Sequence, residues 1–232
     1  MINMTLKKSV LAVASLALLG SVAQAQESKP LNISQVPVRA DAPILFAPRG
    51  WKIEKQVSGD LNHDKVSDAA LVLIENKPAK GADGDPSDRR RALVVLVREG
   101  KGWHRVGFSA NLLMGTRDGG AFFGAVETPV TVVITRAGLI VKMEAGSREV
   151  ATTTHRFRYE SKLGGIYWIG FDSVTRDRAI GDVTSISINF LTGVKRTSIV
   201  KGGSNKKVTT TSRVSTKLRA LHTLTEDDRY SS

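Results

Sequence analysis

The residues best suited to chemistry are four oxygen-bearing side chains in the stretch 59–68. Asp60, Asn62, Asp64 and Asp68 occupy positions 1, 3, 5 and 9 of a short loop. A tight loop with this spacing can surround a hard cation, which prefers six to eight oxygen ligands. The spacing therefore predicts a calcium-type loop.

The loop does not fit an EF-hand. An EF-hand needs a bidentate Glu at position 12 and a helix on each side, whereas position 12 here is Leu71. Leu71 lies in the continuous apolar run 69–74, which is typical of a buried strand. An Asp/Asn-rich β-turn, whose side chains accept hydrogen bonds from their own backbone, remains an alternative to a metal site.

A loop of this kind that leads directly into a buried strand resembles the calcium loop of integrin-type FG-GAP and VCBS repeats. The family pattern is Asp-x-Asp/Asn-x-Asp-Gly-x-x-Asp, and the resemblance covers a single repeat at residues 51–74. Lys65 stands where the family has Gly. A left-handed backbone at a non-Gly residue costs about 1 kcal/mol, and the ammonium repels a cation, so we expect Lys65 to weaken calcium binding. The ligands that the resemblance implies are the side chains of Asp60, Asn62, Asp64 and Asp68 and the backbone carbonyl of Val66.

Residues 1–25 have the three parts of a secretory signal peptide. Lys7 and Lys8 precede an apolar core at 10–19, and an A-x-A cleavage site ends at Ala25. The apolar core is too short to anchor the chain across a membrane. Cleavage leaves 232 − 25 = 207 residues without a cysteine, which excludes a disulfide framework and a lipid-modified Cys. We therefore expect a periplasmic or secreted protein with no transmembrane anchor.

The chain is strongly basic. Its formal net charge of +12 becomes 12 − 2 = +10 once Lys7 and Lys8 are removed. Such an excess favours polyanions, and the envelope address points to an anionic envelope polymer or an acidic protein and argues against a genomic nucleic acid. A basic surface that serves only solubility is the alternative.

The pattern of the chain predicts an all-β fold, an antiparallel sandwich or barrel-like domain. Strand-length runs recur throughout residues 43–200, and no helical period follows the signal. The apolar runs 69–75 and 92–97 should pair as central strands covered on both faces. Residues 26–42 read as a linker or arm, and residues 201–232 as a basic tail with at most one edge strand before disorder.

Seven charged side chains are candidate ligand or anion contacts. One group lies in the stretch 76–91, expected to be an exposed loop, another in the glycine-rich loop 116–124, and the third on one face of the strand 150–159. Arg176 and Arg178 could extend the third group into a basic patch. Solvated surface charge is the alternative for each of them. The seven candidates are Arg89, Arg90, Arg91, Arg117, Asp118, Arg156 and Arg158.

No recognisable catalytic motif is present. The sequence has no H-E-x-x-H zinc motif, no G-x-S-x-G elbow and no cysteine nucleophile, although a carboxylate pair for glycoside cleavage would leave no spacing signature. We therefore assign no catalytic residue and expect a noncatalytic binding or structural module of the bacterial cell envelope. A hydrolase of an envelope polymer with structural calcium, and an inhibitor or immunity protein, remain alternatives.

Overall fold

The computed structural model describes residues 29–82, 84–85, 87–124, 126–204 and 206–230. The predicted signal peptide at 1–25 lies outside this range. Within it, no helix combines the length and the apolar character needed to cross a bilayer.

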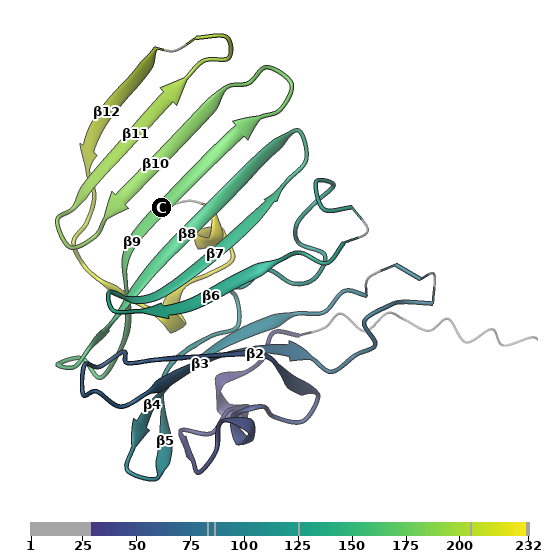
Figure 1. Cartoon of the computed structure of the whole chain (residues 1–232), viewed down its shortest axis with the longest axis vertical. Coiled ribbons are helices and arrows are strands. Elements are labelled where there is room, and N and C mark those ends of the chain that lie inside the picture. Colours follow the sequence, from purple (N-terminus) through teal and green to yellow (C-terminus); the bar gives the residue numbers. More distant parts are fainter. Residues whose placement is uncertain (1–28, 83, 86, 125, 205, 231–232) are drawn as a thin grey trace, which may run out of the picture.

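The chain forms two antiparallel sheets that share one hydrophobic cluster, so the prediction of an all-β sandwich is confirmed. Figure 1 shows the small sheet below the large one, whose strands β10 to β12 extend away from it. The small sheet contains β1 (Arg39–Ala40), β2 (Trp51–Gly59), β3 (Asp68–Glu75), β4 (Arg91–Glu99) and β5 (Gly102–Ser109). Its strand order is β1-β5-β4-β3-β2.

The large sheet has the strand order β12-β11-β10-β9-β8-β7-β6, and β13 pairs with β9 beside this path. Four short 3-10 helices are described: η1 (Ile33–Gln35) precedes β1, η2 (Pro43–Phe46) lies between β1 and β2, and η3 (Leu221–Thr223) and η4 (Asp227–Arg229) follow β13. The strands of the large sheet are β6 (Val130–Thr135), β7 (Gly138–Gly146), β8 (Glu149–Glu160), β9 (Gly165–Asp177), β10 (Val183–Asn189), β11 (Val194–Val200), β12 (Lys207–Arg213) and β13 (Arg219–Ala220).

Strands β3 and β4 lie at the centre of the small sheet, as the continuous apolar runs predicted. They pair antiparallel, and every residue of β3 is buried. Ala70 and Val72 face the large sheet, whereas Leu71 and Leu73 face the other side. A strand that is covered on both faces needs apolar residues at every position, which explains the absence of alternation.

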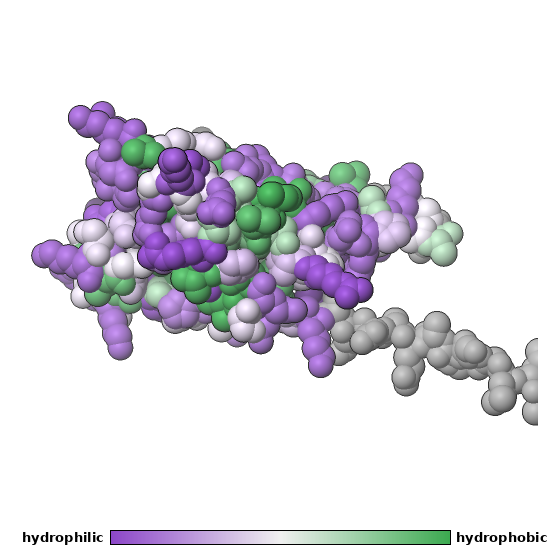
Figure 2. Space-filling view, turned by 90° about the horizontal axis from the view of Figure 1, so that it is seen from below, coloured by the Kyte–Doolittle hydropathy of each residue, from purple (hydrophilic) through white to green (hydrophobic). Residues whose placement is uncertain are grey.

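The second cover of the small sheet is the segment 29–47, which contains the described residues, 29–42, of the predicted linker or arm and is called the arm from here on. Leu31, Val36 and Phe46 from this arm are at most 3% exposed. They pack in a hydrophobic cluster with Leu71 and Leu73, on the face of the small sheet that points away from the large sheet. Other residues of the arm, such as Ile44 and Leu45, are exposed. On the face seen from below, hydrophobic groups are separated by hydrophilic ones (Figure 2). The arm is therefore part of the folded domain.

Strand β2 has a β-bulge at Glu54, and its side chains pack in different hydrophobic clusters before and after the bulge. The pairing with β3 shifts between Ile53 and Lys55, so Ile53 lies opposite Leu73 on the arm side. Val57 instead packs against the large sheet. Regular alternation would place Ile53 and Val57 on one face, but the extra residue reverses the alternation and puts them on opposite faces.

The segment after β12 is folded, which corrects the prediction of a disordered tail. Leu221 and Leu224 are 1% exposed, and Arg229 is 7% exposed. Both leucines belong to the core cluster between the sheets. The lysine-rich composition suggested disorder, but Leu221, Leu224 and Arg229, together with the pairing of β13 with β9, attach this segment to the rest of the fold.

Candidate functional site

The acidic loop joins β2 to β3, and its side chains point back toward its own backbone. The two carboxylate oxygens of Asp60 accept hydrogen bonds from the backbone N–H groups of His63 (2.7 Å) and Lys65 (3.0 Å). His63 and Lys65 both have left-handed backbones, with φ of 65° and 70°. Lys65 thus adopts the conformation for which the FG-GAP pattern uses Gly, at a cost of about 1 kcal/mol.

Asn62 and Asp64 lie next to each other in the same loop. Asn62 Nδ2 donates to Asp64 Oδ2 (2.9 Å), and Asn62 Oδ1 accepts from the backbone N–H of Asp64 (3.1 Å). Asp64 Oδ1 accepts from the backbone N–H of Val66 (2.7 Å). A carboxylate oxygen has two lone pairs, so accepting one hydrogen bond leaves room for a second partner.

Asp68 has a different role, because it is completely buried at the start of β3. Its Oδ2 accepts from the backbone N–H of Leu61 (2.8 Å) and its Oδ1 from that of Arg98 in β4 (2.9 Å). Burial raises the pKa of this carboxyl group, and the two backbone hydrogen bonds oppose that shift. Asp68 therefore ties the acidic loop to the centre of the small sheet.

The loop brings Asp60, Asn62 and Asp64 together but turns Asp68 toward backbone donors. Among the described residues, no three His, Cys, Asp or Glu side chains gather closely enough to hold a metal ion. The observed hydrogen bonds are those of a side-chain-capped turn. Calcium binding at this loop stays a prediction. Three of the four predicted side-chain ligands, Asp60, Asn62 and Asp64, lie in the same turn.

The arginine run lies partly inside the protein, which corrects the expectation of an exposed loop. Arg89 is 6% exposed and Arg91 is 5% exposed. Arg91 forms two hydrogen bonds with Glu54 (2.7 and 2.8 Å) and donates to two backbone carbonyls. Arg89 forms an ion pair with Glu127. These two guanidinium groups hold distant segments together, and sequence could not show this because their acidic partners are 37 and 38 residues away.

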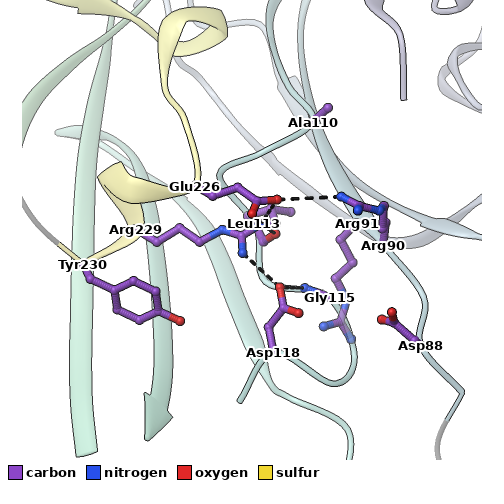
Figure 3. A pocket seen from close by; sticks show the side chains of 10 residues that line it. All are labelled: Asp88, Arg90, Arg91, Ala110, Leu113, Gly115, Asp118, Glu226, Arg229 and Tyr230. Carbon is purple, nitrogen blue, oxygen red and sulfur yellow. Dashed lines mark hydrogen bonds and ion pairs between the residues drawn. The ribbon is translucent and has the colours of Figure 1, made fainter. Parts of the chain in front are cut away.

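Arg90 and Asp118 contribute to a cavity of about 260 Å³ beside η4 (Figure 3). The cavity is also lined by Arg91, Arg229, Asp88 and Glu226, so positive and negative side chains balance. The predicted contact Arg117 is exposed in the neighbouring loop. Equal numbers of acidic and basic groups give this cavity no preference for an anion.

Arg229 is the residue of this region that sequence reasoning missed. Its guanidinium donates to Asp118 Oδ2 (2.9 Å) and to the backbone carbonyls of Asn111 (2.7 Å) and Leu113 (2.8 Å). Its own carbonyl oxygen lies 3.3 Å from His155 Nε2 on β8. A single arginine in a polar segment gives no local signal of such a role. Its contacts attach the C-terminal segment to both the loop after β5 and the large sheet.

The outer face of the large sheet, which points away from the small sheet, carries a surplus of positive charge. Because side chains alternate along each strand, the pairing registers place seven basic and three acidic residues on this face. They are Lys142, Arg156, Arg158, Arg176, Arg196, Lys207, Arg213, Glu144, Glu160 and Asp172.

The structure brings Arg156, Arg158 and Arg176 to this one face, as the sequence suggested. Arg156 forms an ion pair with Asp172, and Arg158 forms one with Glu160. Within the described part of the chain, Arg176 forms no ion pair. Positive charge on the outer face is thus partly neutralised over β8 and left free at the end of β9.

A hollow of about 360 Å³ lies on the outer face where β9 ends. Its lining includes Phe122, Glu144, Val174, Arg176 and Arg178. The ring of Phe122 is 40% exposed, and the guanidinium carbon of Arg178 lies 5.2 Å from the ring centroid. The backbone N–H of Phe122 donates to the carbonyl of Gly146 (2.8 Å), which fixes the glycine-rich loop beside the sheet. Two arginines and an exposed aromatic ring therefore share one concave surface.

No family model, no curated protein and no solved structure shows significant similarity to this chain. The function therefore has to be inferred from the side chains that the two sheets bring together.

Proposed function

We propose that this chain is an exported, noncatalytic binding module of the bacterial cell envelope. The hollow beside Phe122 would bind an acidic envelope polymer, with Arg176 and Arg178 pairing with its anionic groups. Guanidinium groups form bidentate hydrogen bonds with carboxylates. Phe122 carries the Arg178 guanidinium over its ring and is still 40% exposed, so its exposed part gives an apolar contact for a sugar ring. The observation that carries this proposal is the hollow with two arginines and an aromatic ring on the basic outer face.

The position of the hollow supports the same proposal. It lies on the sheet face that does not pack against the small sheet, so a long polymer can reach it without entering the core. Lys142 on β7 and Arg196 on β11 occupy one cross-strand row of this face, with Asp172 of β9 between them. Adjacent strands are about 4.8 Å apart, so these two cations lie roughly 19 Å apart on the face.

The test compares two charge-reversed proteins for binding to polygalacturonate, an acidic glycan, by isothermal titration calorimetry. Arg176→Glu with Arg178→Glu removes the charges of the hollow. Arg49→Glu with Lys52→Glu makes the same change in net charge at exposed residues of the small-sheet side. We expect at least a tenfold loss of affinity for the first protein and less than twofold for the second at physiological salt. Equal losses would mean that only net charge matters and would refute a defined site.

We also propose that calcium stabilises the loop between β2 and β3, with Asp60, Asn62 and Asp64 as side-chain ligands. Carboxylates that repel one another fold together more readily when a cation neutralises them, so metal binding would contribute to folding stability. A ligand at 100 times its Kd adds about 2.7 kcal/mol, which raises the melting temperature of a chain of this size by about 5 to 10 °C.

Melting curves in calcium and in chelator test this second proposal. The protein without its predicted signal peptide should melt higher in calcium, Asp64→Ala should show no shift, and Asp41→Ala, an exposed aspartate of the arm, should behave like the parent. If calcium does not shift the parent protein, the loop is a capped turn and no metal is involved.

A further inference from the structure

Strand β12 is an open edge of the large sheet. It lies at the end of the strand order and pairs only with β11 there, far from the small sheet (Figure 1). All seven of its residues are exposed. Its pairing with β11 has no register shift. Natural edges are protected by charged side chains, bulges, prolines or short length. Strand β12 has a charge at each end, Lys207 and Arg213, but residues 208–212 between them carry no charge, no bulge and no proline.

The hydrogen bonds of the neighbouring strands show which backbone groups of β12 face outward. The N–H of Val214 donates to the carbonyl of Gly193, so this opposing pair is hydrogen-bonded. Hydrogen-bonded and non-hydrogen-bonded pairs alternate along an antiparallel ladder. The N–H and C=O groups of Val208, Thr210 and Ser212 are therefore directed toward β11. Those of Lys207, Thr209, Thr211 and Arg213 are directed away from the sheet.

The side chains of β12 define what an added strand would need. Lys207 and Arg213 lie on the basic outer face, and Val208 lies on the opposite face beside Ile199. Val208 is 53% exposed and Ile199 is 39% exposed. Thr210 and Ser212 share the inner face with Val208. An extended segment with acidic residues near Lys207 and Arg213 on its outer side, and an apolar residue near Val208 on its inner side, would match both faces.

A second copy of this chain fits the edge poorly. Antiparallel pairing of two β12 strands over their full length, centred on Thr210, places Lys207 of each copy opposite Arg213 of the other. Like charges directly opposite in a sheet destabilise the pairing. The charge pattern therefore favours a different chain with acidic residues.

We propose that β12 binds an extended acidic segment of a partner protein by adding it as a further antiparallel strand. The partner segment alternates acidic and apolar residues over about seven positions. Backbone hydrogen bonds to the outward-facing groups of β12 supply a large part of the affinity, and its two terminal cations select the acidic side chains. This surface is separate from the hollow beside Phe122 and does not depend on polymer binding there.

The test uses a fluorescent ten-residue peptide that alternates Glu with Val and Thr, measured by fluorescence polarisation against the purified protein. Thr211→Pro removes one outward N–H without touching the hydrogen bonds to β11, which edge strands tolerate. Thr211→Ala is the matched control, because it changes the side chain and keeps the N–H. We expect at least a tenfold loss of affinity for Thr211→Pro and less than a twofold change for Thr211→Ala.

Two further measurements distinguish strand addition from purely electrostatic binding of the peptide and from self-association. A peptide N-methylated at alternate residues keeps its charges but cannot donate hydrogen bonds along one edge, so it should fail to bind. Binding of that peptide as tightly as the unmodified one, or equal binding to Thr211→Pro and Thr211→Ala, overturns the proposal. A dimer of the protein that Thr211→Pro dissociates in sedimentation also overturns it, since a second copy would then occupy the edge.

Discussion

The stability of the protein should fall between pH 7 and pH 5 because of His155. Its side chain is fully buried on β8, with ring centroids 5.1 Å from Phe171 and 5.5 Å from Trp168. Burial lowers its pKa from 6.5 to about 4, although the Arg229 carbonyl and the charge of Asp228 oppose the shift. The folded protein therefore holds His155 neutral at a pH where the unfolded chain protonates it.

The sign and size of the effect follow from these two pKa values. The contribution of neutral His155 is fully present above pH 6.5 and is lost as the pH falls toward 4. Each pKa unit corresponds to about 1.36 kcal/mol, so the unfolding free energy should drop by about 2 kcal/mol between pH 7 and pH 5 from this residue alone. Below about pH 4 the two states bind this proton equally and no further loss arises from it.

Urea denaturation of the parent protein and of His155→Gln at the two pH values measures this contribution. Gln can still donate to the Arg229 carbonyl but does not titrate, so the pH dependence of the variant should be smaller by about 2 kcal/mol. His222→Gln, a change at an exposed histidine near η3, should keep the pH dependence of the parent. Equal losses of free energy in His155→Gln and in the parent between pH 7 and pH 5 would refute this role of His155.

Two other buried side chains, Asp68 and Arg229, give predictions for denaturation experiments. Asp68→Asn places an amide N–H₂ against one of two backbone donors, so the unfolding free energy should fall by about 1 to 3 kcal/mol. Asp60→Asn, in the half-exposed part of the loop, should cost less, and an equal cost would contradict the role of Asp68. Arg229→Lys should cost at least about 2 kcal/mol, because an ammonium cannot reach Asp118 and two carbonyls in the geometry of a guanidinium. An unchanged urea midpoint for this variant would show that the contacts of Arg229 do not stabilise the C-terminal segment.

The sandwich could be predicted because its evidence is local. The continuous apolar runs of β3 and β4 required a cover on both faces, and the structure supplies the large sheet on one face and the arm on the other. The alternation of β8 likewise placed Arg156 and Arg158 on one face, and the structure buries His155 and Phe157 on the other. Side-chain periodicity depends only on neighbouring residues, so it can be read from one sequence.

The errors arose where distant residues meet. Arg91 looked like part of an exposed loop because its partner Glu54 lies on another strand, at a bulge that alternation does not reveal. The segment after β12 looked disordered because its attachments are scattered along the chain: Leu221 and Leu224 in the core, the two-residue pairing of β13 with β9, and the contacts of Arg229. The hollow on the outer face depends on Phe122 from one loop and Arg176 from β9, which lie 54 positions apart in the sequence.

The most direct measurement of the central proposal is a nuclear magnetic resonance titration of the ¹⁵N-labelled protein with polygalacturonate. We predict shifts concentrated at Phe122, Arg176 and Arg178 and at their neighbours on the outer face of β8 and β9. These shifts should saturate and should be absent in the Arg176→Glu, Arg178→Glu protein. Shifts spread over all basic residues, or centred on Arg49 and Lys52 at the small-sheet side, would contradict a binding site in the hollow.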